Sequence, residues 1–218
     1  STLGKYLFGW YNHCPDTLLV SFDGGSKDNA IPREAIARFW IPADLYAHAE
    51  RGCWWFGEDL AKEYAHSDPG ALITMRRADP GQDKGWEWNP MSSTVTGEVI
   101  NFLHLCPNGV RSMSAELAGM VESSQNIAVL HTEEDIWFAR ISLRSNKDQL
   151  LGGMLGRIRI MAEMSGMDCT KGNEYPAWNY KADSPLREKM QAIFKEMYGQ
   201  DAQIRALHAG LECGLFAE

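Results

Sequence analysis

Alternating apolar and polar positions near the start of the chain predict a β-hairpin. In residues 18–23 the apolar side chains at 18, 20 and 22 share one face, which is the period of a half-buried strand. Gly24 and Gly25 then allow a turn, and Pro32, which donates no backbone hydrogen bond, makes the return strand begin at an edge or a bulge. The hairpin tip therefore carries three polar side chains, Asn29, Arg33 and Glu34.

Longer apolar periods and capping residues predict helices. These are expected over residues 3–12, from Asp44 to about 66, from Ser92 or Ser93 to about 105, from Asn146 to about 164, and from Pro185, capped by Ser184, to Gly199. Short extended runs predict further strands over residues 71–75, 126–131, 136–143, 168–171 and 204–207. Residues 79–90 form a loop by their glycine and proline content, anchored by Trp86 and Trp88.

The predicted elements repeat in order along the chain. Residues 1–78 and 92–180 each give helix, hairpin, helix and strand, although the two halves share negligible sequence identity. Because such a half buries one side of a small sheet under its helices, we expect an α+β fold of two ferredoxin-like halves. Joined edge to edge, the halves make one antiparallel sheet of about eight strands with helices on one face.

Composition and charge exclude several classes of protein. The 218 residues carry 29 acids against 21 bases, a net charge of −8, which does not suit a nucleic-acid surface. No apolar run approaches the ~20 residues needed to span a bilayer, and the start lacks a signal pattern, so we expect no membrane partner and a cytoplasmic location. Five cysteines without a Cys-x-x-Cys pair suit reduced thiols: Cys14, Cys53, Cys106, Cys169 and Cys213.

Two seven-residue motifs carry a resemblance to a known family. Residues 29–35, Asn-Ala-Ile-Pro-Arg-Glu-Ala, follow the glycine pair, and residues 208–214 read His-Ala-Gly-Leu-Glu-Cys-Gly. With shorter matches at 107–110, 121–124, 144–145, 175–178 and 184–185 in the same order, the chain resembles the aminoacyl-histidine dipeptidases, a branch of the di-zinc aminopeptidase and carnosinase clan. The agreement spans nearly the whole chain.

The resemblance implies that this chain is an internal fragment of a cytosolic zinc-dependent dipeptidase that hydrolyses Xaa-His and similar dipeptides. Residues 1–180 would be its lid, and residues 181–218 a helix and strand that return to a catalytic domain outside this sequence. Both ends look cut, because the chain starts without methionine and stops just after a motif. The fragment would be inactive alone, and a homodimer is an open alternative.

The family's zinc ligands fall outside this sequence, so we assign no metal residue here and expect the two zinc ions only in the full-length parent. The family places a His-x-Asp motif and a Glu-Glu pair upstream, and a last histidine downstream. Glu133-Glu134 imitates the catalytic pair, but it lies between two alternating runs and is better explained as an acidic hairpin tip. His104 with Cys106 would be at most a two-ligand fragment of a metal site.

The resemblance supplies five site residues. Asn29 resembles a lid asparagine that stabilises the oxyanion of the tetrahedral intermediate, a role that suits an amide donor. Arg144 resembles the lid arginine that holds the substrate carboxylate, where a planar guanidinium gives two parallel bonds. Beside the substrate, the resemblance places His208, Glu212 and Gly214. A plain turn asparagine and a surface arginine are the structural alternatives.

Two other functions stay open at this point. One is a free-standing α+β interaction module whose hairpins pair edge to edge with a partner or with a second copy. The other is a protein that binds a metal or a carboxylate without catalysis.

Overall fold

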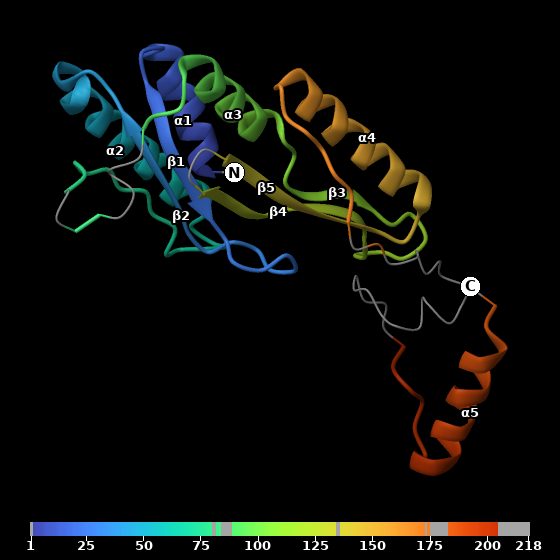
Figure 1. Ribbon diagram of the computed structural model, residues 1–218. Helices are drawn as coiled ribbons and strands as arrows, with labels where there is room; N and C mark the ends of the chain where they lie inside the picture. Colours follow the sequence, from blue (N-terminus) through green and yellow to red (C-terminus); the bar gives the residue numbers. More distant parts are fainter. Residues whose placement is uncertain are drawn as a thin grey trace. The chain divides into compact units, whose positions relative to one another are not determined.

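The computed structural model describes residues 2–79, 82–83, 89–133, 136–172, 174 and 183–204 (Figure 1). The chain folds as two compact units. The first comprises Ser1–Asn108, Asn126–Ser142 and Ile158–Cys169, and the second Gly109–Gln125, Leu143–Arg157 and Thr170–Glu218. The boundary predicted near residue 180 lies outside the described residues.

The α+β prediction is confirmed, with one antiparallel sheet of five strands among the described residues. Its order is β2-β1-β4-β3, and β5 pairs with β4. The helices are α1 (Thr2–His13), α2 (Tyr46–Glu63, after the 3₁₀ turn Ala43–Leu45), α3 (Ser93–Leu105), α4 (Asp148–Met164) and α5 (Pro185–Tyr198). The strands are β1 (Leu18–Gly24), β2 (Ala35–Trp40), β3 (Gly109–Met113), β4 (Val121–Glu133) and β5 (Ile136–Ser145).

The core of the first unit lies between its sheet and three helices. Figure 1 shows α1, α2 and α3 on one face of β1 and β2. Side chains with almost no exposed surface fill this layer: Leu7, Leu19, Phe22, Val99, Ile100 and Leu103. The polar atoms of the buried aromatic residues are satisfied inside, because Trp10 donates to Thr17 Oγ1 (2.8 Å) and Tyr6 donates to the Ala49 carbonyl (3.0 Å). Burial raises the pKa of Tyr6, so its hydroxyl stays protonated as that donor.

On one edge of strand β1, side-chain hydroxyls accept backbone hydrogen bonds that a neighbouring strand would otherwise accept. It pairs with β2 from Leu18 to Gly24, whereas the pairing recorded with β4 is Gly24 opposite Leu130. The backbone N–H of Leu19 donates to Thr96 Oγ1 (3.0 Å), and that of Phe22 donates to Thr132 Oγ1 (2.9 Å). These buried hydroxyls satisfy donors that would otherwise cost about 1–3 kcal/mol each.

Several helix ends follow from local chemistry, as predicted. Ser92 caps α3 by accepting from the Val95 N–H (3.3 Å). Ser184 caps α5 with Pro185 in its first turn, and Gly199 ends it at a φ of 67°. The cap predicted at Asp44 is wrong, because this residue lies in a 3₁₀ turn and α2 begins after it without a side-chain cap.

The cap predicted for α4 is also wrong. Asn146 Oδ1 is buried without a hydrogen-bond partner among the described residues, so its side chain does not satisfy a helix N–H. The first turn of α4 is closed by backbone hydrogen bonds: the Lys147 carbonyl accepts from the N–H groups of Leu150 (3.1 Å) and Leu151 (3.2 Å).

Two of the predicted strands do not form. Residues 71–75 run over the helices: Ile73 lies against Gly57 of α2, and Met75 sulfur accepts from the Tyr6 hydroxyl (3.8 Å). Apolar side chains here therefore pack on a helical surface, not in a sheet. Residues 168–171 leave α4 without joining a strand, and Cys169 packs against the core.

The described strands therefore number five where about eight were expected, and β3 was missed. Strand β3 is largely exposed and pairs with β4 through register shifts, so it has no clean alternation to detect. Trp86, Trp88 and most of residues 204–207 lie outside the described residues. Of the helices that the structure describes, none has both the length and the apolar character to cross a bilayer.

Candidate functional site

The loop between β1 and β2 presents Asn29 on the surface. Asn29 is exposed and lies in a turn in which the Ala30 N–H donates to the Lys27 carbonyl (3.3 Å). The polar residues that precede it favour this turn, and Pro32 delays the return strand until Ala35. Asn29 thus lies at the tip of the hairpin, as predicted.

The loop is fixed to β4 and β5 at three points. Gly25 has a φ of 71° and lies so close to β4 that an added Cβ would be 2.0 Å from the Ala128 carbonyl oxygen. Asn126 Nδ2 donates to the Ala30 carbonyl (2.7 Å), and Arg140 pairs with Asp28 (2.8 Å). The backbone on both sides of Asn29 is therefore positioned by the neighbouring strands.

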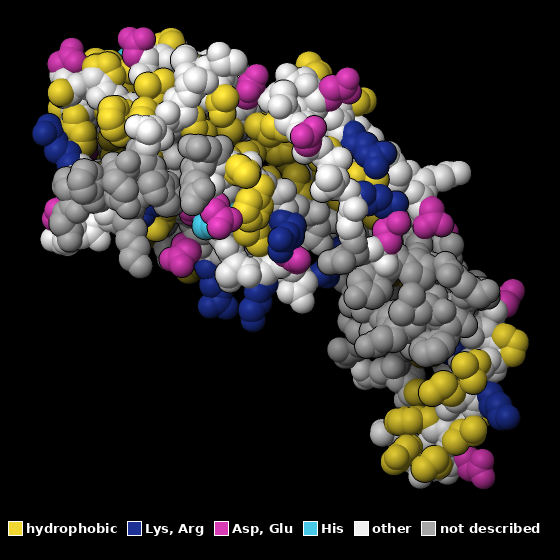
Figure 2. Space-filling view, viewed as in Figure 1, with side chains coloured by type: hydrophobic (Ala, Val, Ile, Leu, Met, Phe, Trp, Pro, Cys, Tyr) yellow, Lys and Arg dark blue, Asp and Glu magenta, His cyan; other side chains and the backbone are white. Residues whose placement is uncertain are grey.

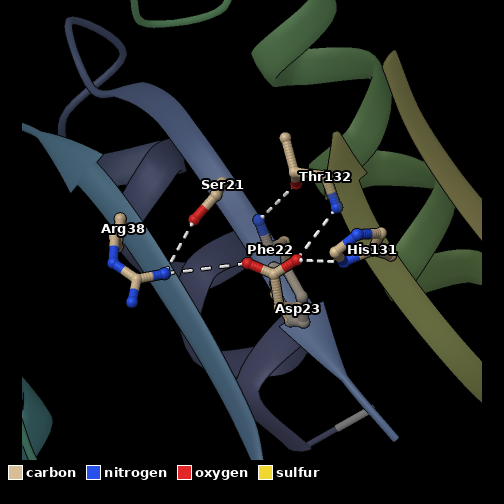
Figure 3. A network of polar contacts seen from close by, with 6 residues as sticks. All are labelled: Ser21, Phe22, Asp23, Arg38, His131 and Thr132. Atoms are coloured by element: carbon tan, nitrogen blue, oxygen red, sulfur yellow. Dashed lines mark hydrogen bonds and ion pairs between the residues drawn. The ribbon is translucent and has the colours of Figure 1, made fainter. Parts of the chain in front are cut away.

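A polar network at the base of the hairpin connects three strands (Figure 3). Asp23 Oδ1 accepts from the Thr132 N–H (2.9 Å) and lies 2.9 Å from His131 Nδ1. On the other side, Arg38 Nη1 lies 3.7 Å from Asp23 Oδ2 and donates to Ser21 Oγ (3.2 Å). Since Asp23 belongs to β1, Arg38 to β2 and the other two to β4, this carboxylate holds the start of the loop in register.

The Asp23–His131 pair orients an imidazole, but the described residues around it do not form a metal site. His131 is about half exposed and packs edge-on against Phe138, with ring centroids 5.5 Å apart. Within the described ranges, no group of three or more His, Cys, Asp or Glu side chains could hold a metal ion. His104 and Cys106, at the end of α3, do not form a metal site either. His104 stacks on Phe8 with ring centroids 3.7 Å apart, and Cys106 is buried.

Arg144 lies near the end of β5, in the second unit, where its side chain is partly buried. In the same unit, Ser145 Oγ accepts from the Lys147 N–H (3.1 Å), and Lys147 Nζ pairs with Glu122 (2.5 Å). This carboxylate raises the pKa of Lys147. Asn29 belongs to the first unit.

The remaining predicted site residues lie outside the described residues: His208, Glu212 and Gly214. Of the Glu133-Glu134 pair, Glu133 is exposed at the end of β4, and Glu134 also lies outside.

Sequence reasoning missed the residues that hold the loop. Asp23 was expected on the polar face of its strand, yet nothing local indicates that it meets His131 and Thr132. Asn126 and Arg140 belong to the second predicted hairpin, and their contacts join residues about a hundred positions apart. These contacts depend on how the strands pair, which no residue near them in the sequence indicates.

No protein-family model matches the chain, but it is similar to known dipeptidases. The chain is 27% identical over 201 residues to a cytosol non-specific dipeptidase of Escherichia coli (strain K12), which covers 92% of this chain and 40% of that protein. It superimposes on the crystal structure of aminoacylhistidine dipeptidase from Vibrio alginolyticus with a TM-score of 0.84 and 30% identity, over 99% of this chain and 42% of that one. The predicted resemblance is confirmed, and the chain spans about two-fifths of the length of these relatives.

The anchoring of the loop predicts a strong effect of Gly25→Ala. The left-handed φ should cost about 1–2 kcal/mol for any other residue, and the clash with the Ala128 carbonyl should add about 1–3 kcal/mol. Gly166→Ala is the matched control, because its φ is 62° but its nearest neighbour is the flexible Glu98 carboxylate at 3.2 Å. Urea unfolding should show a clearly larger loss of stability for Gly25→Ala; equal losses would contradict the anchoring.

Proposed function

We propose that this chain is the lid segment of a metal-dependent dipeptidase that hydrolyses Xaa-His and similar unblocked dipeptides. The observation that carries the proposal is its likeness, over almost its whole length, to a continuous part of two dipeptidases. The proposed parent is cytoplasmic, in line with the name of the Escherichia coli relative, and a homodimer remains open.

Asn29 is proposed to stabilise the oxyanion. Hydrolysis of a peptide bond passes through a tetrahedral intermediate whose carbonyl oxygen gains negative charge. An amide N–H aimed at that oxygen acts most strongly when its backbone is fixed before the reaction. The exposed Asn29 amide on a loop held by Gly25, Asn126 and Arg140 has this character.

Arg144 is proposed to bind the carboxylate at the C-terminal end of the dipeptide. A guanidinium can donate two parallel hydrogen bonds to one carboxylate, which fixes the orientation of the substrate as well as its position. The family motif around Arg144 and its partly buried setting at a strand end support this assignment. His208, Glu212 and Gly214 are proposed to line the same substrate from the other domain.

Residues 1–180 are proposed as the lid and residues 181–218 as the return to the catalytic domain. The exposed apolar face of α5 supports the second part, since Leu186, Met190 and Met197 are 69%, 62% and 67% exposed. Figure 2 shows hydrophobic side chains gathered along this helix. A helix with such a face is suited to packing against the remainder of the parent polypeptide. The proposed duplication of the lid is supported only in outline, because two strands separate α1 from α2 whereas three, β3, β4 and β5, separate α3 from α4.

Zinc is proposed for the parent on the strength of the family resemblance. The described residues do not fit a zinc site, because they offer no cluster of three suitable ligands. The family resemblance assigns the ligands and the general base to the other part of the parent, and the roles proposed for this chain are confined to substrate and oxyanion contacts.

The carboxylate role predicts that Arg144→Ala in the full-length parent lowers kcat/KM for a β-alanyl-histidine dipeptide by about 10- to 100-fold. That range corresponds to the loss of a charged hydrogen bond of about 1.5–3 kcal/mol. Arg144→Lys should recover part of the loss, since it keeps the charge without the planar fork. The exposed Arg111 of β3 gives the control Arg111→Ala, and an unchanged kcat/KM for Arg144→Ala removes this residue from the site.

The oxyanion role predicts a different kinetic signature for Asn29→Ala. Its kcat should fall by about 10²- to 10³-fold with little change in KM, because the contact forms fully only in the transition state. Ser26→Ala, in the same exposed loop, is the control and should leave both constants unchanged. A rise in KM alone would show that Asn29 binds the substrate without stabilising the oxyanion.

A further inference from the structure

Helices α1 and α2 border an open groove of about 250 Å³ in the first unit, which the proposed dipeptidase function does not use. Its lining residues are Lys5, Tyr6, Gly9, Trp10 and His13 of α1 and His48, Gly52 and Phe56 of α2. An engineered cavity of about 150 Å³ in another protein binds benzene, so this volume can hold a larger ring system.

The two walls have the same design. On α1, Lys5, Gly9 and His13 follow at intervals of four residues, and on α2, His48, Gly52 and Phe56 do the same. Residues four apart share one helix face, so each stripe runs along the groove. His13 stacks on His48 with centroids 4.7 Å apart, and Tyr6 meets Phe56 at 5.6 Å. The helices therefore run antiparallel, and this register sets Gly9 opposite Gly52.

Helix packing does not account for these glycines. An added Cβ at either position meets nothing within 4 Å, whereas glycines that allow close approach of two helices would leave no such space. Glycine in a helix interior costs about 0.5–1 kcal/mol relative to alanine. The pair thus lowers helix stability and leaves the middle of the groove open.

The groove combines an apolar floor with a basic rim. Phe56 is partly exposed, whereas Trp10 and Tyr6 at the bottom of the groove are only 5% and 7% exposed and have their polar atoms bonded to Thr17 and Ala49 inside the protein. Exposed at the rim are Lys5, His13 and His48. The lining contains no carboxylate, and no recorded ion pair joins these three to another described residue.

From this arrangement we infer that the groove between α1 and α2 binds a small aromatic carboxylate. The ring system packs on Trp10, Tyr6 and Phe56 in the space beside the two glycines. The carboxylate accepts a charged hydrogen bond from the Lys5 ammonium, at the end of the groove where Tyr6 meets Phe56; the His13–His48 pair lies at the other end. A free aromatic amino acid fits less well, because its ammonium group meets a basic rim without an acidic partner. The inference does not depend on the proposed dipeptidase function.

The test is isothermal titration of the 218-residue chain at neutral pH and low salt with indole-3-acetate. We expect saturable 1:1 binding, with indole and acetate each binding at least about tenfold more weakly, since each lacks one of the two recognition elements. Lys5→Gln should weaken indole-3-acetate binding by about tenfold or more through the loss of a charged hydrogen bond. Absence of saturation at millimolar indole-3-acetate overturns the inference.

Leucine substitutions that fill the groove test the inference more directly. Gly9→Leu projects a side chain into it from α1, Gly52→Leu does so from α2, and both should abolish binding. Gly156→Leu is the matched control, because Gly156 is a helical glycine of α4 with open space at its Cβ, and it should bind like the wild type. Circular dichroism identifies folded variants. Wild-type affinity in a folded variant at either groove position overturns the inference.

Discussion

The buried edge of β1 that lacks a full strand partner is the constraint on which the first unit depends. A strand needs partners for the donors on both edges, and β1 obtains one set from β2 and much of the other from side chains. Thr96 of α3 and Thr132 of β4 accept from Leu19 and Phe22, and Asp23 accepts from Thr132 in return. Helix, hairpin and second hairpin are thereby joined through buried polar contacts, each of which is costly to leave unmade.

The position of the Asn29 loop follows from these contacts between β1, α3 and β4. The chain leaves β1 at Gly24, directly beyond Asp23, and turns at Gly25 against the backbone of β4. Two long-range contacts, from Asn126 to Ala30 and from Arg140 to Asp28, then hold the loop that presents Asn29. The backbone that carries this exposed amide is thus held by the neighbouring strands, a condition that the oxyanion role proposed for Asn29 needs.

The sequence predicted those parts of the fold that local chemistry decides. The glycine pair, the serine caps at 92 and 184 and the glycine that ends α5 act within a few residues, so their signals are readable. Ile73 and Met75 have an apolar pattern that fits a strand, but that pattern does not say whether the partner is a sheet or a helix. The contacts of Asp23, Asn126 and Arg140 join distant residues and carry no local signal. The roles of Asn29 and Arg144 came from family motifs and stay predictions.

The central claim, that the chain supplies the lid and not the metal chemistry of a dipeptidase, is tested most directly by elemental analysis. The 218-residue chain and the full-length parent would be dialysed in parallel, and zinc content and hydrolysis of a β-alanyl-histidine dipeptide measured on the same samples. The account predicts bound zinc and turnover in the parent, and neither in the chain alone. Tightly bound zinc with turnover in the 218-residue chain would contradict it, because the catalytic ligands would then have to lie within this sequence.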